Sequence, residues 1–136
     1  MGISLDTSRW PLTVVVPGSK VSNEELAAFL TDYTALVRAK REPYVIAIDL
    51  RLSSDMPAAQ RKIITDHMQK QEEFARLYCK GTVLVFSSAI MRALLTGILW
   101  MRKPSQPLHV TATLDEAADW AHAQIKRTTM GMSIPA

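Results

Sequence analysis

The sequence has very little cysteine, because Cys79 is the only one among 136 residues. An intrachain disulfide is therefore excluded, and so are the disulfide frameworks that hold many small secreted domains together. Cys79 also falls at the expected end of a helix, where the helix dipole disfavours the reactive thiolate. We expect a structural thiol in a protein of the reducing cytoplasm.

Long hydrophobic runs are also missing. The most apolar segment, residues 89–101, is interrupted by Arg92 and is shorter than the roughly 20 residues that cross a bilayer. The first residues, Met1 to Asp6, do not combine a basic segment with an apolar run, as a signal peptide would. The sequence therefore predicts neither a membrane span nor a secretory leader.

Short motifs of catalysis and cofactor binding are absent as well. The chain has no glycine-rich phosphate loop, GxSxG elbow, HExxH or CxxC sequence. The three histidines, His67, His109 and His122, do not have the spacing of a metal site. We expect a protein that is not an enzyme and that binds no cofactor and no metal.

The charge balance is only mildly basic, with a formal net charge of +3 and a pI of about 9.2. Many basic residues fall at expected helix C-termini, where each cation is stabilised by roughly 0.3 to 1 kcal/mol through the helix dipole. These residues are Lys40, Arg41, Arg76, Lys80, Arg102, Lys103, Lys126 and Arg127. A nucleic-acid partner is not expected, although an anionic surface at this edge remains an alternative.

What the sequence does contain is the composition of one globular domain, with 48% hydrophobic and 21% charged residues. We assign residues 1–127 to this domain and residues 128–136 to a C-terminal tail. Apolar runs bounded by turn residues predict five strands, and the first two form a hairpin. The predicted strands are residues 3–7, 12–16, 44–50, 82–86 and 108–112.

Capping boxes and three- and four-residue apolar spacing predict the helices. Ser22 with Glu25, and Thr113 with Glu116, each place a hydroxyl and a carboxylate where they satisfy the first backbone amides of a helix. The predicted helices begin near Asn23, Pro57, Ala89 and Leu114. The second of them is expected to run without a break to residue 78, with its inward face formed by Ile63, Ile64, His67, Met68, Gln71, Phe74 and Leu77.

The resulting order, ββαβαβαβα, predicts a single layered α/β domain with a largely parallel central sheet and helices packed on it. In such a fold the carboxyl ends of the strands meet at one edge, where ligands commonly bind. Hydroxyl, carboxylate and guanidinium groups are expected there, as in an anion or phosphate site. They are Asp49, Arg51, Arg61, Ser87, Ser88 and Arg92. Routine helix capping by serine is the simpler interpretation.

The predicted third helix, residues 89–103, is apolar around most of its circumference. Three interpretations follow. It packs between the sheet and its neighbours, its outer face docks a partner or a second copy, or an apolar ligand lies beneath it. The outer face would comprise Met91, Leu95 and Trp100.

Four segments together resemble the STAS-like family of anti-sigma-factor antagonists and sulfate-transporter cytoplasmic domains. They are residues 44–49 with the following serine loop, the second helix, residues 81–86, and the closing residues 113–120. The resemblance implies a compact domain that docks partner proteins and is switched by phosphorylation of a loop serine. Ser53 or Ser54 matches that position, and a phosphate there would add about −1.5 to −2 charges beside a docking surface.

The sequence thus predicts a non-enzymatic regulatory or interaction module that contacts a protein partner or a second copy of itself. The alternative is a small-ligand-binding module, with an anion at the strand ends or an apolar ligand under the third helix.

Overall fold

A computed structural model describes residues 2–18, 20–51, 58–86, 88 and 107–129 of the chain. Within these residues the protein is a five-stranded sheet with helices on both faces. The strands are β1 (Ile3–Asp6), β2 (Leu12–Pro17), β3 (Tyr44–Asp49), β4 (Cys79–Val85) and β5 (Leu108–Thr111). The helices are α1 (Asn23–Lys40), α2 (Ala58–Lys70), α3 (Glu72–Tyr78) and α5 (Leu114–Thr129).

The strands lie in the sheet in the order in which they occur in the sequence, β1-β2-β3-β4-β5. Strand β1 pairs antiparallel with β2, whereas β2, β3, β4 and β5 are all parallel. The predicted N-terminal hairpin and parallel central sheet are therefore confirmed. The carboxyl ends of the parallel strands also share one edge, as expected.

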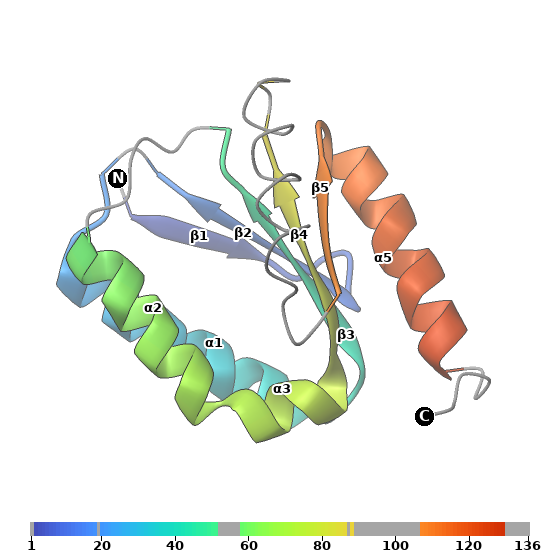
Figure 1. The fold of residues 1–136 in the computed structure, drawn as a ribbon, viewed down its shortest axis with the longest axis horizontal. Helices are drawn as coiled ribbons and strands as arrows, with labels where there is room; N and C mark the ends of the chain where they lie inside the picture. Colours follow the sequence, from blue (N-terminus) through green and yellow to red (C-terminus); the bar gives the residue numbers. More distant parts are fainter. Residues whose placement is uncertain (1, 19, 52–57, 87, 89–106, 130–136) are drawn as a thin grey trace.

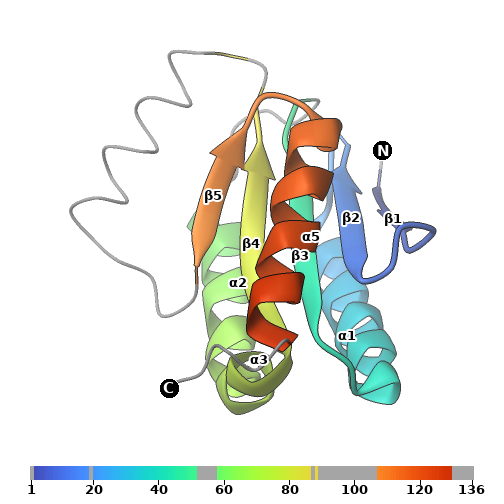
Figure 2. The same ribbon diagram turned by 90° about the vertical axis from the view of Figure 1, so that its right-hand side faces the viewer.

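Helices α1, α2 and α3 lie on one face of the sheet, and α5 lies on the other (Figures 1 and 2). Figure 2 shows α5 in front of the sheet and α1 and α2 behind it. Helix α1 begins with the predicted capping box, in which Ser22 and Glu25 bond each other's backbone amides at 3.0 Å. Helix α5 extends to Thr129, two residues past the predicted end of the domain.

Two details of the second helix were predicted wrongly. It is divided into α2 and α3 at Gln71, which has φ −102° and ψ 8° and whose side-chain oxygen is held by Arg38. In addition, Met68 and Leu77 are 63% and 67% exposed and are not part of a buried stripe. The change of helix axis at Gln71 rotates the residues that follow it, and this accounts for the exposure of Leu77.

The face of the sheet under α5 is tightly packed. Val45, Ala47, Val83 and Val85 of the central strands are all 0% exposed. Small residues of α5, Ala117 and Ala121, lie against them and are 0% exposed as well. Small side chains let the helix approach the strands closely, so one of the two hydrophobic core clusters of the domain lies on this side.

Candidate functional site

The opposite face of the same two strands is covered much less completely. The side chains that alternate with the buried ones are only half-buried, namely Ile46 and Ile48 of β3 and Thr82 and Leu84 of β4. Central strands of a parallel sheet are normally buried on both faces. An apolar surface of the sheet therefore remains open toward α1 and α2.

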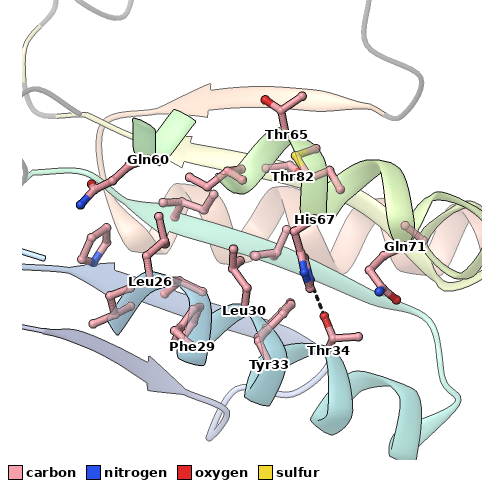
Figure 3. Close-up of a pocket in the computed structure, with 18 of the residues that line it drawn as sticks. Leu26, Phe29, Leu30, Tyr33, Thr34, Gln60, Thr65, His67, Gln71 and Thr82 are labelled. Carbon is pink, nitrogen blue, oxygen red and sulfur yellow. Dashed lines mark hydrogen bonds between the residues drawn. The ribbon is translucent and has the colours of Figure 1, made fainter. Parts of the chain in front are cut away.

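A cavity of about 1490 Å³ lies over this surface, between the sheet and helices α1 to α3 (Figure 3). Its floor includes Ile46, Ile48, Leu84 and Thr82 of the sheet. Small-molecule sites are commonly pockets of roughly 300 to 1,000 Å³ with mostly apolar walls. This cavity is larger than that range, so a large ligand could be accommodated in it.

Helix α1 supplies one wall of the cavity through residues spaced three and four apart. Leu26, Phe29, Leu30, Tyr33 and Val37 all line it, and Figure 3 shows the first four together along this helix. The spacing places these side chains on a single face of the helix.

One end of the cavity is closed by a buried cluster. Val37, Tyr44 and Cys79 pack together there with Tyr33. Burial raises the pKa of Tyr33 and Tyr44 above the ordinary value of a tyrosine. Burial likewise raises the pKa of the Cys79 thiol, which donates a hydrogen bond to the carbonyl of Gly81 at 3.4 Å. These groups are therefore uncharged at neutral pH, and Cys79 has the environment of a structural thiol.

Polar side chains of the helices also border the cavity, and most of them are hydrogen-bonded within the protein. His67 Nε2 and Thr34 Oγ1 lie 2.6 Å apart and join α2 to α1 (Figure 3). Burial, with a smaller contribution from Lys70, lowers the pKa of His67, so its ring is neutral at pH 7. At the other end of the pocket in Figure 3, the Gln60 amide donates to the carbonyl of Val21.

Thr82 differs from these polar groups. Its side chain lies in the cavity wall between apolar neighbours of the sheet, and its backbone amide donates to Pro107 at 3.0 Å. Its hydroxyl, in contrast, makes no hydrogen bond to any residue in the ranges that the structure describes. The hydroxyl of this half-buried residue thus borders the cavity without a hydrogen-bond partner among the described residues.

Four of the six residues predicted to form an anion site at the strand ends lie in the described part of the chain. Asp49 is buried at the end of β3 and binds the Arg51 guanidinium at 2.7 and 2.8 Å. These hydrogen bonds lower the pKa of Asp49 and raise that of Arg51, so both groups are charged and neutralise each other. Arg61 lies in α2, and Ser88 is exposed just beyond β4. The attraction of Arg51 for an incoming anion is reduced by its pairing with Asp49.

The other predicted site residues lie outside the described residues. They are the phosphorylation candidates Ser53 and Ser54, the edge residues Ser87 and Arg92, and the interface residues Met91, Leu95 and Trp100.

In the described ranges, no three histidine, cysteine, aspartate or glutamate side chains form a group that could hold a metal ion. No helix within these same ranges is both long enough and apolar enough to cross a membrane.

The cavity floor was not identified from the sequence. The run from Tyr44 to Leu50 predicted a strand covered on both faces, and nothing in it distinguishes Val45, which is fully buried, from Ile46, which is not. The one available signal was Thr82, a hydroxyl residue near the start of the apolar run that continues to Phe86.

Comparison with known proteins supports the fold. No family model matches the sequence, and no curated protein matches it. Among solved structures, the chain is similar to an uncharacterized protein of the DUF3478 family from Shewanella loihica PV-4, which has a SpoIIAA-like fold. The TM-score is 0.68 at 12% sequence identity, over 88% of this chain and 94% of the other. The chain therefore has the SpoIIAA-like, or STAS-like, fold that its sequence resembles.

Proposed function

We propose that this protein is a non-enzymatic binding module that holds an apolar small molecule in the cavity between its sheet and helices α1 to α3. The observation that carries the proposal is the contrast between the two faces of β3 and β4. One face is completely buried under α5, whereas Ile46, Ile48 and Leu84 on the other face border a cavity of about 1490 Å³.

The chemistry of the cavity supports an apolar occupant. Burying apolar surface is favourable by roughly 25 cal/mol per Å², and the partly exposed floor residues supply such surface. The tyrosines and the cysteine at the closed end are uncharged, and so is His67. A long acyl or prenyl chain, or a polycyclic compound, fits the size and polarity of this space better than a small charged metabolite does.

The interaction module predicted from the resemblance remains the second candidate. One observation favours it, since Leu77 on α3 is a large hydrophobic side chain that is 67% exposed. Met68 on α2, which also borders the cavity, is 63% exposed. Exposed apolar surface commonly marks a docking site. The two functions are compatible, because a ligand beneath α2 would alter the surface that this helix presents.

Titration with a neutral, apolar naphthylamine dye whose fluorescence rises in apolar surroundings tests the proposal. We expect saturable binding by the intact chain. Ile48→Trp and Leu84→Trp place a larger side chain in the cavity floor, so each should weaken dye binding severalfold. Leu77→Trp is the matched control, because Leu77 is exposed and does not line the cavity.

The proposal fails if the dye does not bind, or if the control variant weakens binding as much as the two cavity variants do. Circular dichroism of each variant, recorded in parallel, verifies that the fold is retained.

A further inference from the structure

We infer that the ligand carries an uncharged hydrogen-bonding group, such as a hydroxyl or a carbonyl, and that this group binds the Thr82 hydroxyl in the cavity floor. The inference rests on the proposed function and specifies the class of its ligand.

The Thr82 hydroxyl differs from the two other threonine hydroxyls among the described cavity residues, which are already bonded. The Thr34 hydroxyl of α1 is bonded to His67 at 2.6 Å. The Thr65 hydroxyl donates to the carbonyl of Arg61 at 2.9 Å. Thr82 makes no such bond within residues 2–18, 20–51, 58–86, 88 and 107–129.

Thr82 lies between apolar side chains in the sheet. It pairs with Ile46 of β3, and the side chain two residues further along β4 on the same face is Leu84. Polar groups next to apolar surface are hydrogen-bonded in most proteins, because an unpaired one loses its hydration without compensation. An apolar ligand that covers Ile46 and Leu84 also covers Thr82, so it must provide a partner for this hydroxyl.

The strand residues that line the cavity are uncharged, and these include Val15, Ile46, Ile48, Thr82 and Leu84. The charged residues that border the cavity come from the helices and from the loop before α1, and they are Lys20, Glu25, Glu72 and Arg76. Glu25 already accepts a hydrogen bond from the Ser22 amide, and Arg76 lies 3.8 Å from Glu72. Lys80, near the start of β4, does not line the cavity, and its ammonium group donates to the carbonyl of Leu77 at 2.9 Å. A carboxylate or an amine placed beside Thr82 would therefore be desolvated without a counter-charge from the strands. A neutral group would not incur that cost.

Two competitors of equal chain length, a linear alkane and the corresponding primary alcohol, test the inference by displacing the bound dye. After correction for the different hydration of the two compounds in water, we expect the intact protein to bind the alcohol about five- to tenfold more tightly than the alkane. That factor corresponds to one hydrogen bond of roughly 1 to 1.4 kcal/mol.

Thr82→Val removes the hydroxyl and keeps the shape of the side chain. We expect it to abolish the preference for the alcohol and to leave the affinity for the alkane and the dye unchanged. Thr65→Val is the control, because that hydroxyl is already bonded within the protein, and it should retain the preference.

The outcomes separate the inference from the function on which it rests. If the dye and both competitors bind but Thr82→Val keeps the full preference for the alcohol, the inference is wrong and the proposed function stands. If neither the dye nor the competitors bind the intact protein, the proposed function itself is wrong. Urea unfolding of Thr82→Val without ligand should show no loss of stability, since the hydroxyl it removes is bonded to none of the residues that the structure describes.

Discussion

The two faces of β4 should respond differently when their side chains are shortened. Val83 is 0% exposed beneath α5, and its neighbour Leu84 is half-buried over the cavity. Val83→Ala removes two carbons from a fully packed site and leaves an empty space, so it should cost about 2 to 3 kcal/mol. Leu84→Ala removes three carbons, but part of their surface is already exposed to an existing cavity, so no new enclosed space forms. Its cost should be about 1 kcal/mol.

The smaller truncation should therefore be the more damaging one. Equilibrium unfolding in urea, followed by circular dichroism, gives the free energy of unfolding for both variants if their m values agree with that of the intact chain. A cost for Leu84→Ala equal to or larger than that for Val83→Ala would refute the reasoning. It would mean that the cavity face of β4 is packed as densely as the face under α5.

Three further predictions concern residues outside the cavity floor. Gly81→Ala should destabilise the fold by about 1 to 3 kcal/mol in a thermal or urea melt, because a Cβ there would lie 2.5 and 2.8 Å from two ring carbons of Trp120; an unchanged melt would show that the ring moves aside at little cost. Ser22→Ala should cost about 1 kcal/mol by removing the N-cap of α1, and a cost near zero would mean that water replaces the cap. Asp49→Asn should cost about 1 kcal/mol at pH 7, because Arg51 lowers the pKa of Asp49 below its ordinary value of 3.8. A carboxylate whose pKa is lower in the folded state stabilises the fold at pH values above its unfolded pKa, and this stabilisation is lost as the pH falls through the folded pKa. The free energies of unfolding of the intact chain and of Asp49→Asn should therefore become equal in acid. A difference between them that stays constant down to pH 2 would contradict this.

Much of the fold could be predicted because its signals are local. The capping boxes at Ser22 and Thr113 marked the starts of α1 and α5, and the apolar runs marked β3 and β4. The parallel pairing followed from the alternation of strands and helices. These features depend on a few neighbouring residues, and so they are visible in the sequence.

The break between α2 and α3 could not be predicted in this way. Glutamine is a good helix former, and Gln71 carries no local stop signal. Its side chain is held by Arg38 of α1, and the guanidinium of Arg38 also lies 4.7 Å from the ring centroid of Phe74. Contacts across 33 positions of sequence therefore accompany the break, and such contacts appear only in three dimensions.

The cavity also depends on contacts between segments that are far apart in the sequence. An apolar ligand site was one predicted alternative, but it was placed under the helix at residues 89–103, which lies outside the described residues. Val45 and Ile46 are equally apolar, and their difference in burial arises from how closely α5 and α1 approach the two faces of the sheet. The type of side chain does not by itself predict how closely each helix approaches the sheet.

Methyl-resolved NMR tests the central claim most directly, through the chemical shifts of isoleucine, leucine and valine side chains as the neutral dye is added. The account predicts that the methyl groups of Ile46, Ile48 and Leu84 shift and saturate together, while those of Val83 and Val85 do not move. Shifts confined to exposed residues such as Leu77, or no shifts at all, would contradict it.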